Sequence, residues 1–274
     1  MSRNQDRLGG AQHKDVSPPP QQGGGGFSFV VPTEFVDLPS QGRFYAEGHS
    51  LHGIDSIEIK QMTAKEEDIL TSRTLLKKGV ALDKLIESLI VDRTINPASL
   101  LIGDRNAIII AARVSGYGND YNTSVQCPAC ETKQNYGFDL NSANIVYGET
   151  RDDLGVTDNG DGTITCVLPK TQVTAVARLL TGREEKTLLN LGNNEGLIST
   201  QLQSIIVSAN GDSSQQAIDY LANNLPSFDS RHLRMVMKMA TPNIDLTQNF
   251  SCTECGHTQE MEVPLTADFF WPDR

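Results

Sequence analysis

Two cysteine pairs of the same form constrain this chain more than any other feature. Each pair has two intervening residues and lies in a polar, turn-forming stretch with strand-like flanks: VQCPACETKQ in the middle of the chain and FSCTECGHTQ near its end. The C-x-x-C spacing allows two thiolates to contact one ion, and Zn²⁺ prefers four such ligands in a tetrahedron. We therefore predict one zinc ion bound by Cys127, Cys130, Cys252 and Cys255. Because four thiolates leave no position for a water molecule, this zinc is expected to be structural.

A disulfide and an iron–sulfur cluster are the alternatives for these cysteines. The sequence runs from Met1 into a polar segment without a secretory-signal pattern, and in a reducing compartment C-x-x-C pairs favour a metal over disulfides. His257 could replace one thiolate, but four cysteines already complete the ligand set. The fifth cysteine, Cys166, lies in the apolar stretch TITCVLP. We expect a buried, inert thiol there, the alternative being a fifth metal contact.

The separation of the two pairs suggests that the chain repeats itself. A strand-like stretch followed by a capping box occurs twice, at Thr63 with Glu66 and at Thr181 with Glu184. The amphipathic stretches IESLIV and LQSIIV follow in the same order, then a helix start, and then a cysteine pair. We predict an α+β fold of two tandem units, residues 27–150 and 151–274, each with a strand, helices and a zinc knuckle, joined by one shared zinc ribbon. The alternative is that common helix signals align by chance.

Shorter patterns predict local features. Pro39-Ser40-Gln41-Gly42 is a turn signature, and Asp104 and Asp229 are placed as N-caps of their helices. The stretch 158–162, DNGDG, resembles a calcium loop, but glycine occupies the third position of that loop and proline the twelfth, where Glu is needed. A hairpin turn is therefore predicted there. The three methionines of RHLRMVMKMA are expected to fill the core, with an adaptable partner surface as the alternative.

Composition and charge limit the partners. The net charge is −11, and the chain carries no Lys or Arg from Met239 through Asp273, so the second knuckle lacks the clustered cations that phosphate binding needs. No apolar run approaches membrane-spanning length. Residues 1–26 are low-complexity and rich in Pro and Gly, and we predict a disordered tail. We find no P-loop, nucleophile elbow or H-E-x-x-H motif, so we expect no enzyme, no small-molecule substrate, no nucleic acid and no membrane partner.

Several phrases of the chain resemble a known family. VDLPSQGRFY, the TAKEEDIL helix, LLIGDRNAIIIAARVSGYGNDY and LPKTQVTAVARLLTGREE are similar to T4-like bacteriophage baseplate hub subunits, over roughly residues 36 to 210. The resemblance implies a structural part of a contractile-tail baseplate, located in the virion and assembled in the host cytoplasm. It implies other baseplate and tail proteins as partners, within a symmetric assembly.

The leading hypothesis is therefore a structural, zinc-containing component of the baseplate hub. A zinc-ribbon adaptor in nucleic-acid metabolism, a tail assembly factor absent from the mature virion, and an enzyme with a structural zinc are the alternatives. For the leading hypothesis we expect partner contacts through residues 27–45, including Phe44 and Tyr45. Residues 269–271, FFW, either pack on their own domain or anchor a neighbour.

Overall fold

A two-stranded antiparallel sheet opens the described part of the chain. The structure is a computed structural model that describes residues 30–191, 197–264 and 267–270. Strand β1 (Thr33–Asp37) pairs with β2 (Ser56–Lys60), with Val36 opposite Ile57. The predicted turn between them is confirmed. Gly42 has φ +69°, and a Cβ there would lie 2.3 Å from the backbone nitrogen of Ile54, so only glycine fits.

Three short helices follow and return the chain to β2. They are α1 (Ala64–Thr71), α2 (Arg73–Lys77) and α3 (Ala81–Leu89). The capping box at Thr63 is confirmed: its hydroxyl accepts from Lys65 N–H, and Glu66 accepts from Thr63 N–H at 3.0 Å. After α3, Ile90 forms an antiparallel bridge with Ile59 of β2.

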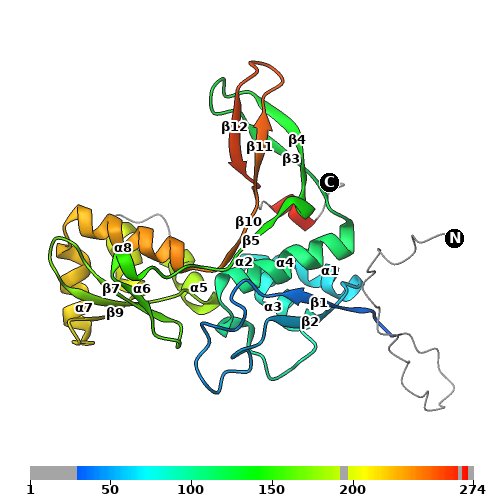
Figure 1. The fold of residues 1–274 in the computed structure, drawn as a ribbon. Helices are drawn as coiled ribbons and strands as arrows, with labels where there is room; N and C mark the ends of the chain where they lie inside the picture. The colour runs from blue at the N-terminus through cyan, green and yellow to red at the C-terminus, as the bar shows by residue number, and fades with distance from the viewer. Residues whose placement is uncertain (1–29, 192–196, 265–266, 271–274) are drawn as a thin grey trace, which may run out of the picture. The chain divides into compact units, whose positions relative to one another are not determined.

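The long helix α4 (Ile102–Tyr117) follows the 3₁₀ turn η1 (Pro97–Ser99) and lies beside β1 and β2 (Figure 1). A second two-stranded sheet, formed by β5 (Asn144–Val146) and β10 (Asn243–Asp245), packs on α4. The approach is close, because a Cβ on Gly103 would lie 2.1 Å from the Pro242 carbonyl oxygen. Segments from the two halves of the sequence therefore meet on α4.

In the second half, the described residues form a four-stranded antiparallel sheet and the helices α5 to α8. The strands, in sheet order, are β6 (Val156–Asp158), β7 (Thr163–Val167), β8 (Thr174–Arg178) and β9 (Ile206–Ala209). The helices are α5 (Gly182–Leu191), α6 (Leu197–Ile205), α7 (Gln215–Asn224) and α8 (Ser227–Ala240). The short 3₁₀ turns are η2 (Leu140–Ser142), η3 (Asp152–Leu154) and η4 (Ala267–Phe270). The predicted hairpin turn is confirmed, since Asn159 N–H donates to Thr163 O between β6 and β7.

Local structures recur in the two halves. The capping box at Thr181 starts α5, as the one at Thr63 starts α1. After α6, Ile206 pairs with Ala177 of β8, just as Ile90 returns to β2. The fold is thus a mixture of helices and several small sheets with the same order of motifs in each half.

Buried aspartates hold the turns after β1 and β7, and this is not the role predicted for them. The prediction that Asp104 and Asp229 are N-caps is wrong: the N-caps are Leu101 and Pro226, and each aspartate lies inside the first helical turn. Both are fully buried. Asp104 accepts hydrogen bonds from the turn residue Ser40, which lies 64 positions away in the sequence. Such a contact carries no local sequence signal.

Aromatic residues expected at an interface lie in the core. Phe44 and Tyr45 are 1% and 4% exposed, so the expectation that they contact a partner directly is wrong. Phe269 and Phe270 are also buried. Of the three methionines in α8, Met237 is buried, Met239 is partly buried and Met235 is 45% exposed. The tail 1–26, residues 27–29 and Trp271 lie outside the described residues.

Candidate metal centre

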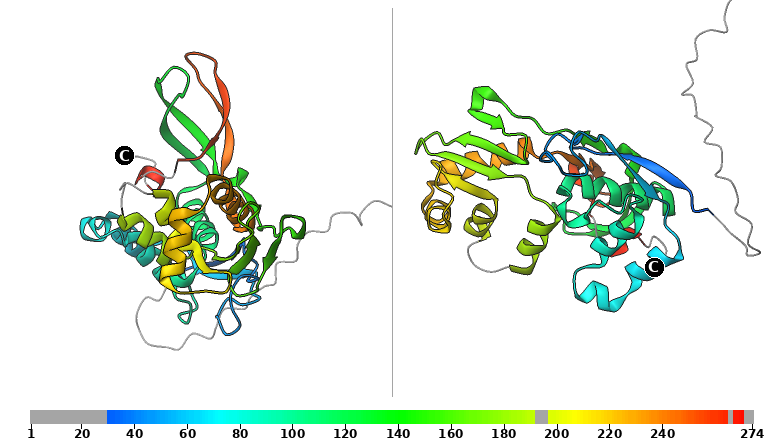
Figure 2. Two further views of the ribbon diagram at one scale, coloured as in Figure 1. Left: turned by 90° about the vertical axis from the view of Figure 1, so that its left-hand side faces the viewer. Right: turned by 90° about the horizontal axis from the view of Figure 1, so that it is seen from below.

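Two antiparallel hairpins carry the cysteine pairs at their tips. The first joins β3 (Asp120–Gln126) to β4 (Lys133–Asp139), and the second joins β11 (Thr247–Ser251) to β12 (Thr258–Glu262). The hairpins lie side by side in Figure 1 and in the left view of Figure 2. The fold therefore brings together two segments more than one hundred residues apart.

The two tips have the same backbone geometry. Cys127 N–H donates to Thr132 O, and Cys252 N–H donates to His257 O, each at 2.9 Å. Glu131 and Gly256, the residues after the second cysteines, both adopt positive φ, at +58° and +69°. A left-handed residue reverses the chain tightly enough for both sulfurs of a pair to point to one side. Proximity within each pair is thus a consequence of local turn geometry.

The four sulfur atoms gather into one cluster. They all lie within 4.8 Å of one another, and each of the pairs Cys127–Cys255 and Cys130–Cys252 has an Sγ–Sγ distance of 3.7 Å. A zinc ion with Zn–S bonds of about 2.3 Å requires sulfurs about 3.8 Å apart in a regular tetrahedron. The donor set and its spacing therefore fit a metal ion. Cys127 and Cys252 are buried, whereas Cys130 and Cys255 are exposed.

The exposed second cysteine of each pair, Cys130 or Cys255, accepts a backbone hydrogen bond from the residue two positions after it. The side chain and backbone of Thr132 hydrogen-bond to Cys130 and lower the pKa of its thiol to about 6. The backbone of His257 lowers the pKa of Cys255, but its hydrogen bonds with Cys130 and the other thiols outweigh this and raise that pKa to about 12. The cluster thus stabilises one thiolate with the protons of its neighbours. A metal that replaces those protons releases them on binding.

Side chains between the hairpins hold them together independently of any ion. Gln134 of β4 donates to Ser251 O and accepts from Thr253 N–H, and Tyr136 OH donates to Asn249 O at 2.8 Å. Further along, Gln248 both donates to Asp139 O and accepts from Asp139 N–H. Sequence reasoning missed these residues. Their signal was the alternation of Gln134, Tyr136 and Phe138 on one face of β4.

The base of the ribbon is anchored in the core. Tyr121 stacks edge-on against Phe269, with ring centroids 5.2 Å apart. The fully buried Arg113 of α4 donates to three backbone carbonyls, those of Phe269, Gly118 and Asp120. Burial lowers the pKa of this guanidinium. The ribbon therefore rises from a rigid junction between α4, β3 and the C-terminal turn η4.

The other two candidate ligands, His257 and Cys166, are not members of the cluster of possible metal ligands. His257 is partly buried, and its Nε2 lies 3.4 Å from Gln259 Oε1. Cys166 is fully buried in β7, and burial raises the pKa of its thiol to about 11, so the expected inert thiol is confirmed. Exposed acidic side chains dominate the hairpins, with Glu131, Glu254, Glu260 and Glu262 against Lys133.

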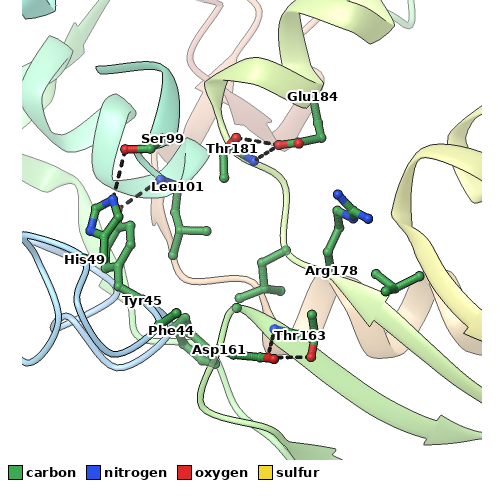
Figure 3. A pocket seen from close by; sticks show the side chains of 14 residues that line it. Phe44, Tyr45, His49, Ser99, Leu101, Asp161, Thr163, Arg178, Thr181 and Glu184 are labelled. Atoms are coloured by element: carbon green, nitrogen blue, oxygen red, sulfur yellow. Dashed lines mark hydrogen bonds between the residues drawn. The ribbon is translucent and has the colours of Figure 1, made fainter. Parts of the chain in front are cut away.

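A separate cavity of about 400 Å³ lies between segments of the two halves (Figure 3). His49 is the one histidine that lines it. Its Nδ1 accepts from Leu51 N–H, and its Nε2 lies 2.9 Å from Ser99 Oγ, so both ring nitrogens are engaged. Burial lowers the pKa of His49, which keeps the ring neutral at pH 7. Glu184 and Thr181 are occupied by their capping box. Because Nδ1 of His49 accepts, the proton of the neutral ring is on Nε2, which donates to Ser99 Oγ, and Ser99 Oγ in turn donates to Asn96 O at 2.8 Å. Ser99 and His49 are therefore not arranged as a nucleophile and its base.

Comparison with known families identifies the chain. A family model described as T4 bacteriophage base plate protein matches residues 31–271, which includes both cysteine pairs and nearly all of the described fold. The chain belongs to this family. The resemblance seen in the sequence is thereby confirmed. No individual curated protein and no solved structure matches the chain.

Membership defines the protein at a general level. It is a baseplate component of a bacteriophage tail, and so a part of an assembly with other tail proteins. Within the described ranges, no helix combines the length and apolar character needed to cross a bilayer.

Proposed function

We propose that this baseplate protein is a structural component of the hub region of a contractile tail, where it docks onto other tail proteins and catalyses no reaction. The family match over residues 31–271 carries the proposal. The cavity of Figure 3 supports it, because His49, Thr181 and Glu184 in its wall already hydrogen-bond to neighbouring protein groups. We place the protein in the tail baseplate of the virion, after its assembly in the host cytoplasm.

The four-cysteine cluster supports a structural role for a metal. We assign one Zn²⁺ per chain to Cys127, Cys130, Cys252 and Cys255. Four thiolates saturate tetrahedral zinc, so the ion would fix the two hairpins to each other and would hold no reactive water. The role of the zinc would thus be to stabilise the paired arrangement of the two hairpins.

The ribbon would also join two tandem units, residues 27–150 and 151–274. Three correspondences support this duplication. The cysteines are 125 residues apart in the two hairpins, as are the buried Asp104 and Asp229. Gln41 and Gln172 both adopt positive φ, at +52° and +56°, in turns held by these two aspartates. The cysteine pairs, the buried aspartates and the turns that they hold therefore occur in the same order in both units, with similar backbone conformation and similar long-range partners.

Complementation of a tail-assembly defect tests the proposed function. A phage lacking this gene should form no complete tails, and the wild-type chain supplied in trans should restore them. Mass spectrometry of purified virions should then detect the chain, and cross-linking should join it to hub proteins. Complete tails without the chain would contradict the structural role. Restoration without the chain in the virion would indicate an assembly factor instead.

Binding to DNA distinguishes the remaining alternative. We expect no retention of duplex or single-stranded DNA at low salt, because the chain carries a net charge of −11 and its ribbon is acidic. Tight binding at physiological salt would favour the zinc-ribbon adaptor.

A further inference from the structure

Strand β1 leaves one edge without a partner among the described residues, since its sheet contains only β2 on the other side. The hydrogen-bond alternation identifies the free groups. Gln61 N–H donates to Pro32 O and Leu38 N–H donates to Asp55 O, so even-numbered residues of β1 bond to β2. The N–H and C=O groups of Thr33, Phe35 and Asp37 therefore face the open edge. An open edge of this kind accepts a further strand.

An apolar groove of about 320 Å³ runs beside this edge. Its floor is the stripe of α4 that contains Ala107, Ile110 and Val114, spaced as one helix face. One wall is β1, with Val36, and the other carries Ile145 of β5. The groove thus separates β1 from the next small sheet on the same helix.

A carboxylate oxygen lies buried at the wall of this groove. Oε1 of Glu34 is shielded from solvent and has no hydrogen-bond partner among the described residues. A buried, unpaired carboxylate oxygen is costly unless something donates to it. A side chain bound in this groove could supply that donor with an N–H or O–H group.

The second half of the chain shows what fills the equivalent position. β7 has the place of β1, with Leu168 corresponding to Leu38 at the start of the following turn. There β6 covers the edge: Val167 N–H donates to Gly155 O, and Thr163 O accepts from Asn159 N–H. The bonded residues of β7 are odd-numbered and correspond to Thr33, Phe35 and Asp37 of β1. β6 runs antiparallel and buries Val156 opposite Cys166.

The described residues directly before β1 are unsuited to the equivalent tight turn. The β6–β7 turn contains Gly160 and Gly162, both with positive φ. The corresponding residues before β1 end in Val30, Val31 and Pro32, and β-branched residues and proline are unsuited to positive φ. Pro32 O accepts from Gln61 N–H, as the corresponding Gly162 O accepts from Leu179 N–H, so the two halves differ in the turn residues and not in this bond.

We propose that the open edge of β1 binds an extended segment of another baseplate polypeptide as an added antiparallel strand. This rests on the proposed assembly role. The segment carries an apolar side chain opposite Val36, as Val156 lies opposite Cys166, and a Lys or Arg that donates to Glu34 Oε1. A basic residue also suits the acidic character of the protein, which has a net charge of −11. The added strand would fill the gap on α4 between β1 and the β5–β10 sheet.

The pair Phe35→Pro and Phe35→Thr tests the strand addition. Proline at this position removes an N–H that faces the open edge and leaves the ladder to β2 intact. Threonine, the residue at the equivalent position of β7, keeps that N–H. Phe35 is 72% exposed, so both full-length variants should unfold at temperatures close to that of the wild type. In the complementation assay, we expect Phe35→Pro to reduce the amount of the chain in purified tails at least tenfold, and Phe35→Thr to reduce it less than threefold. Equal incorporation of the two variants would overturn the proposal, while the proposed function would stand if tails still required the chain.

Photo-cross-linking identifies the occupant. A benzoylphenylalanine introduced in place of Phe35 should, in assembled tails, cross-link to a segment of a different polypeptide that contains an apolar and a basic residue. A cross-link only to residues 1–29 of this chain, or to a second copy of it, would overturn the assignment to another protein. The absence of any cross-link at this position, with a control photoprobe elsewhere in the chain active, would do the same.

Discussion

Asp104 and Asp229 lie at equivalent places in α4 and α8, yet their carboxyl groups respond differently to burial. Burial raises the pKa of Asp104, and the hydrogen bonds from Ser40 and Tyr45 offset this only in part. Burial also raises the pKa of Asp229, but hydrogen bonds from Thr171 and Lys170 outweigh it and lower that pKa. The two carboxylates also differ in their donors, because Asp104 accepts from one backbone N–H, that of Ser40, and from two hydroxyls. Asp229 accepts from two backbone N–H groups, one at each oxygen, which are fixed in place.

Substitution by Asn should separate the two sites. In Asp229→Asn, the new amide nitrogen must face a backbone N–H, and we expect a loss of about 2–3 kcal/mol in the free energy of unfolding at pH 7. In Asp104→Asn, the amide nitrogen can face the hydroxyls of Ser40 and Tyr45, which can rotate, so we expect about 1 kcal/mol. Urea denaturation measures both. Equal losses would contradict this account of the donors.

The two aspartates also predict how the stability cost of each Asn substitution changes with pH. Because the folded-state pKa of Asp229 is depressed, its contribution to stability is present above about pH 4 and is lost as the pH falls through the folded-state value. The penalty of Asp229→Asn should therefore shrink between pH 7 and pH 3. The pKa of Asp104 is raised, so its contribution is present at low pH and lost as the pH rises. The Asp104→Asn penalty should not shrink on acidification.

At the scale of elements, the two capping boxes are expected to act alike. Thr63→Ala and Thr181→Ala each remove an N-cap hydroxyl and should each cost about 1 kcal/mol. Thr71→Ala is the control, because Thr71 is exposed at the end of α1 and its hydroxyl only returns to the carbonyls of its own helix. Its change should be within about 0.5 kcal/mol. A cap variant indistinguishable from this control in chemical denaturation would refute the prediction.

The ribbon should depend on its metal while the body does not. Elemental analysis of protein purified without chelator should give one zinc per chain, Cys130→Ser should lose it, and Cys166→Ala should retain it. Chelation should speed amide exchange in residues 120–139 and 247–262. Exchange in α4 should remain slow, because hydrogen bonds and aromatic contacts outside the cluster still hold the base. Zinc-free wild-type protein, or equal exchange with and without chelator, would count against a structural metal.

At the scale of the whole molecule, the N-terminal residues are expected to be separable from folding. Deleting residues 1–26 should leave the zinc content and the thermal unfolding temperature unchanged, since their Gly-, Pro- and Gln-rich composition offers little apolar area to bury. Calorimetry and metal analysis of the shortened chain test this. A decrease of several degrees would mean that the segment contributes to the folded unit.

The sequence by itself determined the features whose hydrogen bonds close within a few residues. The capping boxes at Thr63 and Thr181 belong to this class, because each partner lies within four positions along the chain. The turn at Gln41–Gly42 belongs to it in part, through the bond from Gln41 N–H to Leu38 O. The inert Cys166 also followed, because an apolar alternating stretch predicts a buried strand. The family resemblance was carried by the same kind of contiguous phrases.

Tertiary structure alone decided the contacts that join distant segments. It placed Asp104 against Ser40 and Tyr45 instead of at a helix start, and so buried the aromatic residues that looked suited to a partner. Among the described residues, it also left the outer edge of β1 without a strand equivalent to β6, which covers β7. A side chain's burial depends on which surfaces the whole chain brings against it. Local periodicity gives the face a residue occupies but not what lies opposite, and that is why the proposed strand-binding edge emerged only from the folded chain.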